Sequence, residues 1–320
     1  MGELVVGVDG SDGSRRALAW AVDEARLRGD GLTVVTVMPS PNLLITPAAI
    51  GEDVRRRADR EASQRAGALF EEVIAPHADV GVAITPVVVR DDATFDALIR
   101  RAADADALIV GSRGLGALRR LLLGSVSSQI AVHADITVVV VPEPSEEQQR
   151  DDKVVGVDGS AHAHAALRRA AAEAAMRGWE LELVMIQPPP PASGGGGPDH
   201  AAVDAYRWAG ALAPAPVPQS DEVQSGHEQL ATHWRNLAER LLEAELDRVD
   251  AATLPNKVMP TVIGADHAAR ALLDVAAWAR LLVLGRRGRG GFTGMLLGSI
   301  SQHCVRHATS PVMIVPPDGA

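Results

Sequence analysis

Short, continuous runs of apolar residues alternate along the chain with stretches in which apolar residues recur every three or four positions. The run LVVGV at 4–8 is followed by a segment in which Leu18, Val22 and Leu27 recur at helical spacing, and then by LTVVTVM at 32–38. Continuous apolar runs are typical of strands buried on both faces, and the wider spacing is typical of amphipathic helices. The alternation predicts an α/β protein with a parallel, doubly wound sheet and right-handed crossovers.

The same alternation continues to about residue 143 and gives five strands in all. Ser11 or Ser14 is expected to cap the first helix, because a hydroxyl at the N-cap accepts a hydrogen bond from a free backbone N–H group. In sheets of this kind, ligands bind at the carboxyl ends of the strands, at a topological switch point. The remaining predicted elements are strands at 84–89, 107–111 and 136–141 and helices at 52–76, 95–102 and 125–133.

The second half of the chain repeats the first. VVGVDGS occurs at 5–11 and again at 154–160, an offset of 149 residues, whereas GSRGLGALRRLLLGS at 111–125 is matched by GRRGRGGFTGMLLGS at 285–299, an offset of 174. The shared order indicates a tandem duplication, and the difference between the offsets indicates an insertion in the second copy. We predict a first domain at 1–143, a linker at 144–152 and a second domain at 153–317 that carries a Pro/Gly-rich insertion at about 187–226.

The composition excludes several classes of protein. Hydrophobic residues make up 47% of the chain, which excludes whole-chain disorder, and the single cysteine excludes a disulfide framework and a cysteine-based zinc site. The net charge of −10 disfavours binding to nucleic acid or to an anionic membrane, because phosphate neutralisation requires an excess of basic residues. No apolar run reaches the ~18 residues of a membrane span, and the N-terminal sequence lacks the features of a signal peptide. We therefore expect a soluble, cytoplasmic protein.

A glycine-rich turn follows the fourth strand of each copy. GSRG at 111–114 is followed, nine residues later, by Gly124–Ser125 at the start of a helix, and GRRG at 285–288 is followed in the same way by Gly298–Ser299. Glycine lets a backbone approach a ligand closely, and a helix start offers free N–H groups and a positive dipole end. A lone GxxG is more often an ordinary turn, but its repetition at the same spacing favours a phosphate-binding loop. It is not a Walker A loop, because no lysine follows the last glycine.

This pattern, G-x2-G-x9-G-[ST] with an aspartate after the first strand, resembles the universal stress protein family. The resemblance covers nearly the entire chain as two tandem domains. It implies an adenine-nucleotide α-hydrolase-like fold, with two five-stranded parallel sheets in the strand order 3-2-1-4-5. It also implies that each domain binds ATP, with or without Mg²⁺, and that the protein is a regulator in the stress response rather than an efficient enzyme.

Carried over by position, the resemblance implies nucleotide contacts from strand ends, from the glycine loop and from the start of the next helix. In the first copy the implied residues are Gly7, Asp9, Val37, Val110, Gly111, Ser112, Arg113, Gly114, Leu115, Gly116, Ala117, Gly124, Ser125 and Val126. In the second copy they are Gly156, Asp158, Ile186, Leu284, Gly285, Arg286, Arg287, Gly288, Arg289, Gly290, Gly291, Gly298, Ser299 and Ile300. Arg286 stands where the first copy has Ser112. We expect the basic residues Arg286, Arg287 and Arg289 to face the phosphates, and we expect the two sites to differ in affinity.

Two other functions stay open. One is a slow ATPase or nucleotide-processing enzyme of the same superfamily, and the other is a ligand-free scaffold that binds partners through the Pro-rich segment. Catalysis by Asp9 or Asp158 is disfavoured, because no base or nucleophile stands beside either residue and DGSDGS at 9–14 does not match the SGGxDS loop of the pyrophosphatase branch. No metal site is expected, since the i,i+4 pair His303 and His307 occurs in one copy only.

The last strand of each copy, at 136–141 and 311–315, is rich in β-branched residues. An exposed apolar edge strand is an association hazard unless it is paired or covered. We therefore expect the two final strands to pair within the chain and to join the domains, and we expect proline at Val139 to disrupt this pairing. Homodimers through other surfaces and regulatory protein partners of unknown identity stay open.

Overall fold

The strands and helices coincide with the apolar runs and amphipathic segments of the sequence. The computed structural model describes residues 2–39, 52–114, 123–143, 152–156, 161–187, 235–236, 238–265, 267–287 and 296–317. The first copy contains β1 (Glu3–Gly7), α1 (Asp12–Arg28), β2 (Gly31–Met38), α2 (Glu52–Ile74), η1 (Ala75–His77), β3 (Ile84–Arg90), α3 (Thr94–Arg101), β4 (Ala107–Gly111), α4 (Ser125–His133) and β5 (Val138–Val141). The second copy contains β6 (Asp152–Gly156), α5 (Ala161–Arg177), β7 (Glu180–Gln187), a helix at 238–246, η2 (Ala251–Thr253), β8 (Val258–Gly264), α8 (Ala268–Ala276), β9 (Leu281–Gly285), α9 (Ser299–His307) and β10 (Val312–Val315).

The element boundaries differ from the sequence prediction by a few residues. β5 begins at Val138, two residues later than predicted, because a bend separates it from α4. β6 begins at Asp152, the last residue of the predicted linker. Ser11 is the N-cap of α1, and its hydroxyl oxygen accepts a hydrogen bond from the Ser14 N–H group at 3.1 Å. The other linker residues and most of the predicted insertion lie outside the described residues.

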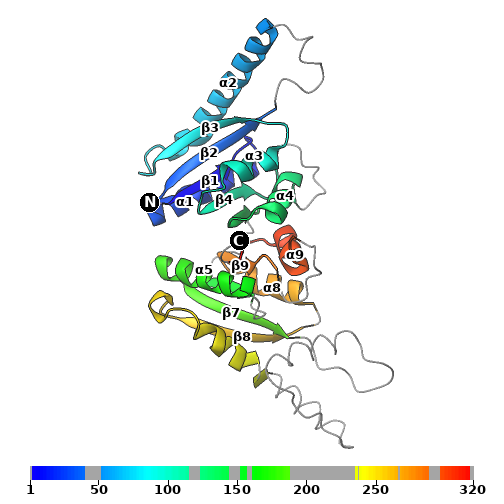
Figure 1. The fold of residues 1–320 in the computed structure, drawn as a ribbon. Helices are drawn as coiled ribbons and strands as arrows, with labels where there is room; N and C mark the ends of the chain where they lie inside the picture. The colour runs from blue at the N-terminus through cyan, green and yellow to red at the C-terminus, as the bar shows by residue number, and fades with distance from the viewer. Residues whose placement is uncertain are drawn as a thin grey trace, which may run out of the picture.

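The strands form one ten-stranded sheet in the order β3-β2-β1-β4-β5-β10-β9-β6-β7-β8. Within each copy the neighbouring strands are parallel, and the order is 3-2-1-4-5, which confirms the predicted fold class. Figure 1 shows the two copies one above the other, with α2 extending beyond the sheet at one end. The strand order reverses between β1 and β4, and again between β6 and β9, so each copy has a switch point of the kind that binds ligands.

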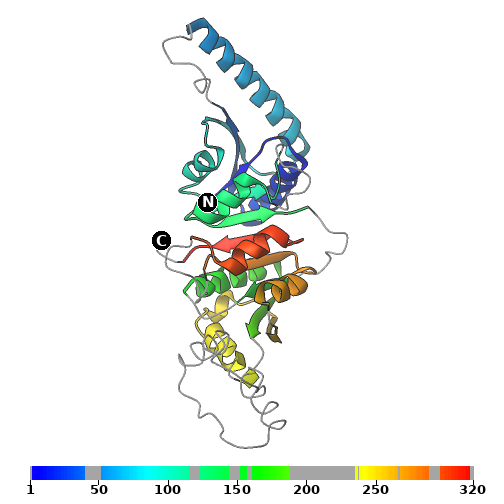
Figure 2. The same ribbon diagram turned by 90° about the vertical axis from the view of Figure 1, so that its right-hand side faces the viewer.

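The two copies join through their last strands. β5 and β10 are antiparallel, with Val140 opposite Val312 and Val138 opposite Ile314. Figure 2 shows these two strands side by side at the centre of the molecule. The prediction that the final strands pair within the chain is confirmed.

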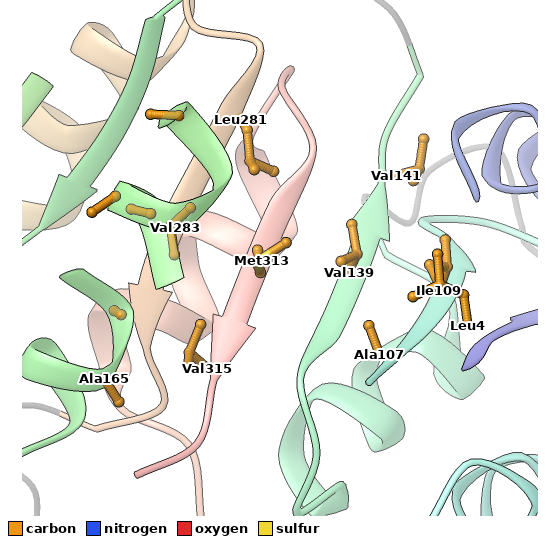
Figure 3. Packing of buried hydrophobic residues seen from close by; sticks show 14 of the residues in the cluster. Leu4, Ala107, Ile109, Val139, Val141, Ala165, Leu281, Val283, Met313 and Val315 are labelled. Carbon is orange, nitrogen blue, oxygen red and sulfur yellow. The ribbon is translucent and has the colours of Figure 1, made fainter. Parts of the chain in front are cut away.

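Helices cover both faces of the sheet, and each hydrophobic core continues across this seam. One core packs against α1 and α5 and includes Val139 and Met313, whereas the other packs against α3, α4, α8 and α9 and includes Val140 and Val312. Figure 3 shows the first core, with residues of β5 and β10 on adjacent strands. Because successive residues of a strand point to opposite faces, consecutive valines of β5 contribute to different cores.

A reciprocal ion cluster joins α1 to α5 beside the first core. Arg28 and Arg177 occupy equivalent positions of the two copies, as do Glu24 and Glu173. Arg28 donates to Glu173 and Arg177 donates to Glu24, and each arginine also donates to the glutamate four residues earlier on its own helix. The two carboxylates are only 4% and 1% exposed. The contact therefore has the approximate twofold symmetry of an interface in which like patches meet.

Candidate functional site

A cleft of about 330 Å³ opens at the carboxyl edge of the sheet in the first copy. It lies at the switch point between β1 and β4, where parallel sheets of this topology bind ligands. It is formed by the ends of β1, β2 and β4, by the loop after β4 and by the N-terminal parts of α1, α3 and α4. The described residues that line it are Gly7, Val8, Asp9, Ser14, Val35, Val37, Thr94, Leu98, Val110, Gly111, Arg113, Gly114, Gly124, Ser125, Val126 and Ser127.

Asp9 follows β1 and organises the start of α1. Its Oδ1 atom accepts hydrogen bonds from the Ser11 N–H group at 3.0 Å and from the Ser11 hydroxyl at 2.6 Å. The Ser11 oxygen also caps α1 and lies 3.4 Å from the carbonyl oxygen of Arg113 in the loop after β4. These contacts hold the Asp9 carboxylate at the cleft, next to the glycine loop.

Gly114 brings the backbone of that loop against the carboxylate. A Cβ atom at this position would lie 2.5 Å from Oδ2 of Asp9, which is closer than non-bonded atoms approach. Glycine alone leaves room there for the carboxylate in its present position. Gly114 thus approaches Asp9 closely, and the approach of the loop glycines to a phosphate stays a prediction.

Three hydrogen bonds connect the first residues of the loop after β4 to β5 and to the start of α4. The Ser112 N–H group donates to the Val141 carbonyl at 2.8 Å, and the Gly124 N–H group donates to the Ser112 carbonyl at 2.7 Å. The Ser127 hydroxyl donates to the carbonyl oxygen of Gly111 at 2.5 Å. These bonds connect the end of β4 and the first loop residue after it to β5 and to the start of α4.

The helix α4 begins at the cleft. Its N-cap is Gly124, and no side chain caps it. The first N–H groups of a helix have no partner within the helix, and the positive end of its dipole lies there. Ser125 and Val126 of this first turn line the cleft, and Val35 and Val37 provide an apolar part. The cleft is therefore suited to a molecule that has an apolar part and an anionic part.

Comparison with known proteins identifies the group to which these features belong. The sequence model of the universal stress protein family matches residues 1–142 in the first copy, and residues 152–213 and 196–316 in the second. The chain belongs to the universal stress protein family. A family member from Mycolicibacterium smegmatis is 30% identical over 317 residues, covering 98% of this chain and 97% of the relative. Another, from Mycobacterium tuberculosis, is 31% identical over 321 residues, covering 97% of this chain and 96% of the relative.

Solved structures support the fold of this universal stress protein. The crystal structure of a universal stress protein from Archaeoglobus fulgidus superposes with a TM-score of 0.64 at 18% identity, and each chain is covered over 98% of its length. A putative universal stress protein from Pseudomonas aeruginosa superposes with a TM-score of 0.56 at 15% identity, covering 99% of this chain and 93% of its own. At these identities the likeness shows the fold, and in both cases it extends over both copies of this chain.

Most of the family residues carried over to the first copy lie together in the cleft. Ser112 is buried and does not line the cleft. Leu115, Gly116 and Ala117 lie outside the described residues. The sequence analysis missed the lining residues Val8, Ser14, Val35, Thr94, Leu98 and Ser127. Ser14 and Ser127 stand two or three residues beyond predicted helix starts, which is the one sequence signal that could have pointed to them.

The second copy of this universal stress protein repeats the framework around the loop. The Arg286 N–H group donates to the Val315 carbonyl at 3.0 Å, and the Gly298 N–H group donates to the Arg286 carbonyl at 2.8 Å. The Ser301 hydroxyl donates to the Gly285 carbonyl at 2.7 Å. These three bonds are the counterparts of those in the first copy, so the two loops have the same supports.

The side chain of Arg286 lies in the contact between the copies instead of facing phosphates, as its sequence position had suggested. Its guanidinium donates to the Asp135 carboxylate at 2.6 Å, to the Val132 carbonyl at 2.7 Å and to the Leu296 carbonyl at 2.9 Å. A buried guanidinium needs several acceptors, and the first copy supplies two of them. The neighbouring Arg287 has its Nε atom 3.5 Å from the same Leu296 carbonyl.

The other residues carried over to the second copy fall into two groups. Gly156, Ile186, Leu284 and Gly285 lie at strand ends, and Gly298, Ser299 and Ile300 form the start of α9. Asp158, Gly288, Arg289, Gly290 and Gly291 lie outside the described residues.

No helix among the described residues is long and apolar enough to cross a membrane. Nor does the described part of the chain bring three or more His, Cys, Asp or Glu side chains together so that they would hold a metal ion. The exposed rings of His303 and His307 stack with their centroids 4.3 Å apart.

Proposed function

We propose that this protein binds ATP in the cleft of its first copy and acts in the stress response as a regulatory nucleotide-binding protein. The observation that carries the proposal is the meeting of three features in one cleft: the start of α4, the glycine loop and the Asp9 carboxylate. Helix starts and glycine loops are the common phosphate sites of α/β proteins. A carboxylate at the end of a strand in such a sheet is suited to hydrogen-bond ribose hydroxyls.

In this proposal each part of the cleft contacts a different part of the nucleotide. The N–H groups of Arg113 and Gly114 and of the first turn of α4 hold the phosphates, and Asp9 contacts the ribose. Val35 and Val37, in β2, contact the adenine. Asp9 is the one carboxylate among the described lining residues, so it is also the residue that would hold Mg²⁺ bound to the phosphates.

A binding role is favoured over efficient catalysis by the chemistry of the lining. Among the described residues that line the cleft there is no histidine, cysteine or lysine. Asp9 is the one lining side chain among the described residues that could act as a general base, and its Oδ1 atom already accepts two hydrogen bonds from Ser11. Efficient phosphoryl transfer depends on positioned cationic groups around the phosphates, and Arg113 is the one cationic side chain among the described lining residues.

The test is equilibrium binding of ATP to the full chain and to the variant Gly114→Ala. The added methyl group would displace the Asp9 carboxylate, so we expect binding to weaken about tenfold, or by about 1.4 kcal/mol. Gly67→Ala is the matched control, because Gly67 lies on the exposed face of α2 and a Cβ there meets nothing within 4 Å. Binding that is absent from the unmodified protein, or that is equal in Gly114→Ala and the control, would overturn the proposal.

Incubation with ATP followed by nucleotide chromatography separates regulation from enzymatic turnover. We expect ATP to be recovered intact over a time in which an active ATPase would convert it to ADP. Rapid conversion would favour the slow-ATPase alternative, and protein that binds no nucleotide would favour the scaffold alternative.

A further inference from the structure

An arginine and a glutamate form an ion pair beside the first cleft, just beyond the ends of two neighbouring strands. β4 and β5 are parallel, and Gly111 lies opposite Val141 at their carboxyl ends. Arg113 and Glu143 each follow this pair by two residues, so the register brings them together. Nη1 of Arg113 donates to Oε1 of Glu143 at 3.1 Å, and the two side chains are 29% and 56% exposed. The ion pair therefore lies at the edge of the sheet where the cleft opens.

Arg113 belongs to the cleft as well as to this pair, because it is the one cationic residue among the described lining residues. Its backbone is held against the start of α1. The Arg113 carbonyl oxygen lies 3.4 Å from the Ser11 hydroxyl and would lie 2.2 Å from a Cβ atom at Gly13. Its side chain has several rotatable bonds, and exposed ion pairs contribute little net stability. Arg113 can therefore exchange one anionic partner for another while its backbone stays in place.

A phosphate group and the Glu143 carboxylate would compete for this guanidinium. A guanidinium binds either anion with the same planar fork of N–H donors. In the proposed function the phosphates lie at the N–H groups of Arg113 and Gly114, within the loop that carries the guanidinium. The carboxylate also has the same sign of charge as the phosphates and repels them. Glu143 therefore opposes the binding of phosphates and leaves the contacts to adenine and ribose unaffected.

A second arginine remains near Glu143 if Arg113 turns toward a phosphate. Nη2 of Arg16, in α1, lies 3.9 Å from Oε1 of Glu143. The Nε atom of Arg16 is buried and has no hydrogen-bond partner among the described residues. The carboxylate thus keeps a cationic neighbour, which lowers the cost of releasing Arg113.

The sequence places these charges in the first copy and not in the second. Pro317 stands at the position of Glu143, at the offset of 174 residues, and Ala165 stands at that of Arg16, at the offset of 149. Any effect of the Glu143 carboxylate is therefore specific to the first cleft.

We infer that Glu143 is a charge gate on the first cleft. It holds Arg113 while no nucleotide is bound, and it yields Arg113 to the phosphates when ATP binds. The gate makes the affinity of the cleft depend on phosphate charge, since a nucleoside without phosphates gains nothing from Arg113 and is not repelled by Glu143. This inference rests on the proposed function and assigns a role in specificity to a residue that does not itself line the cleft.

Isothermal titration of the full chain with ATP, at fixed ionic strength, tests the gate in Glu143→Gln. We expect ATP to bind about fivefold more tightly, or by about 1 kcal/mol, which is the upper range for an exposed ion pair. Adenosine, measured by displacement of a fluorescent ATP analogue, should bind with unchanged affinity. In the Arg113→Gln background the same substitution at Glu143 should change ATP affinity by less than about twofold, because the competition for the guanidinium is gone.

Glu180→Gln is the matched control and should bind ATP like the unmodified protein. Glu180 also pairs with a cation at the surface, Lys257 at 2.7 Å, but it begins β7 of the second copy, at the amino ends of the strands. Equal ATP affinities of Glu143→Gln and the parent, or equal gains with and without Arg113, would overturn the gate and leave the proposed function intact. A parent protein that binds no ATP would overturn both.

Arginine side-chain resonances follow the exchange of partners in the unmodified protein. The Nε–Hε signal of Arg113 is assigned by its loss from the spectrum of Arg113→Gln. We expect this signal to shift when ATP is added to saturation and to stay in place with adenosine. A signal that does not move at saturating ATP would show that Arg113 keeps Glu143 as its partner, which would overturn the inference.

Discussion

The ammonium group of Lys153 lies 3.3 Å from Oε2 of Glu173, and these side chains are 0% and 1% exposed. Lys153 stands at the position that Leu4 occupies in the first copy. Three guanidinium groups, those of Arg28, Arg169 and Arg177, also donate to Glu173. Burial, and secondly the positive charges of Arg28 and Arg169, hold the pKa of Lys153 well below its ordinary value of 10.5.

Replacing Lys153 with leucine should therefore stabilise the protein by about 1 kcal/mol or more at pH 7, because Glu173 keeps three arginine partners. Because the pKa of Lys153 is lowered in the folded protein, the unfolded chain binds the proton of this ammonium group more tightly than the folded protein does. The cost of burying Lys153 is thus full below its lowered pKa and disappears as the pH rises toward 10.5.

Urea unfolding of the parent and of Lys153→Leu at pH 7 and pH 10 measures this difference. The gain should be smaller at pH 10. Lys257→Leu is the control, because Lys257 pairs with Glu180 at the surface and is 58% exposed. A Lys153→Leu protein that is less stable than the parent at pH 7 would show that the ammonium group contributes net stability to the cluster.

The reciprocal cluster itself should contribute strongly to stability. Burial lowers the pKa of Arg177 only to about 10, so the side chain is charged at neutral pH. Arg177→Met leaves Arg28 as the partner of Glu24 among the described residues of the cluster, and it should cost about 3 kcal/mol in urea unfolding. Arg100→Met removes an ion pair whose arginine is 63% exposed and should cost less than ~1 kcal/mol. Equal losses in the two variants would mean that the cluster is no stronger than a surface pair.

The hydrogen bonds of β5 show which of its residues form the seam with β10. The Leu108 N–H group donates to the Thr137 carbonyl, and the Ser112 N–H group donates to the Val141 carbonyl. Since strand residues alternate in direction, Val139 also directs its backbone groups toward β4, and its neighbours direct theirs toward β10. Proline at Val139, the test suggested by the sequence, would thus damage the first copy and not the seam directly.

Val140→Pro removes an N–H group that points across the seam toward Val312. We expect a larger radius of gyration in small-angle scattering and a lower melting temperature. Val88→Pro is the matched control, because even-numbered residues of the outer strand β3 face away from β2 and Pro86 already occupies such a position. Unchanged compactness and melting of Val140→Pro would contradict the role of the seam in joining the copies.

The thiol of Cys304 should be unreactive in the folded protein. Burial raises its pKa to about 12, so almost no thiolate is present at pH 8. A thiol reagent such as dithionitrobenzoate should label one group per chain in urea and none over the same period without urea, since the chain has a single cysteine. Prompt labelling of the native protein would show that α9 opens readily.

The strands and the glycine loops could be predicted from the sequence because each is encoded by a local pattern of residues. LTVVTVM and its counterparts are continuous apolar runs, and GSRG with its distant Gly–Ser pair occurs twice. The ion cluster could not be predicted in this way. Glu24 and Arg28 have the spacing of an ordinary solvent-exposed helix pair, and only the packing of α1 against α5 buries them.

The same limit applied to parts of the site. Arg286 adjoins a predicted phosphate loop, but its partners Val132 and Asp135 come from another copy that only the paired edges bring near. Thr94 reaches the cleft because α3 packs beside β2, which no local pattern encodes. Residues whose role depends on contacts between distant segments can be identified only from the three-dimensional structure.

The pairing of β5 with β10 inside one polypeptide also sets how the assembly responds to dilution. Two separate chains that met through such strands would dissociate as their concentration fell below the dissociation constant. Here the second half is tethered to the first, so each half experiences the other at an effective concentration on the order of millimolar, whatever the amount of protein present. The continuous sheet should therefore persist in a cell that makes only a few copies of the chain.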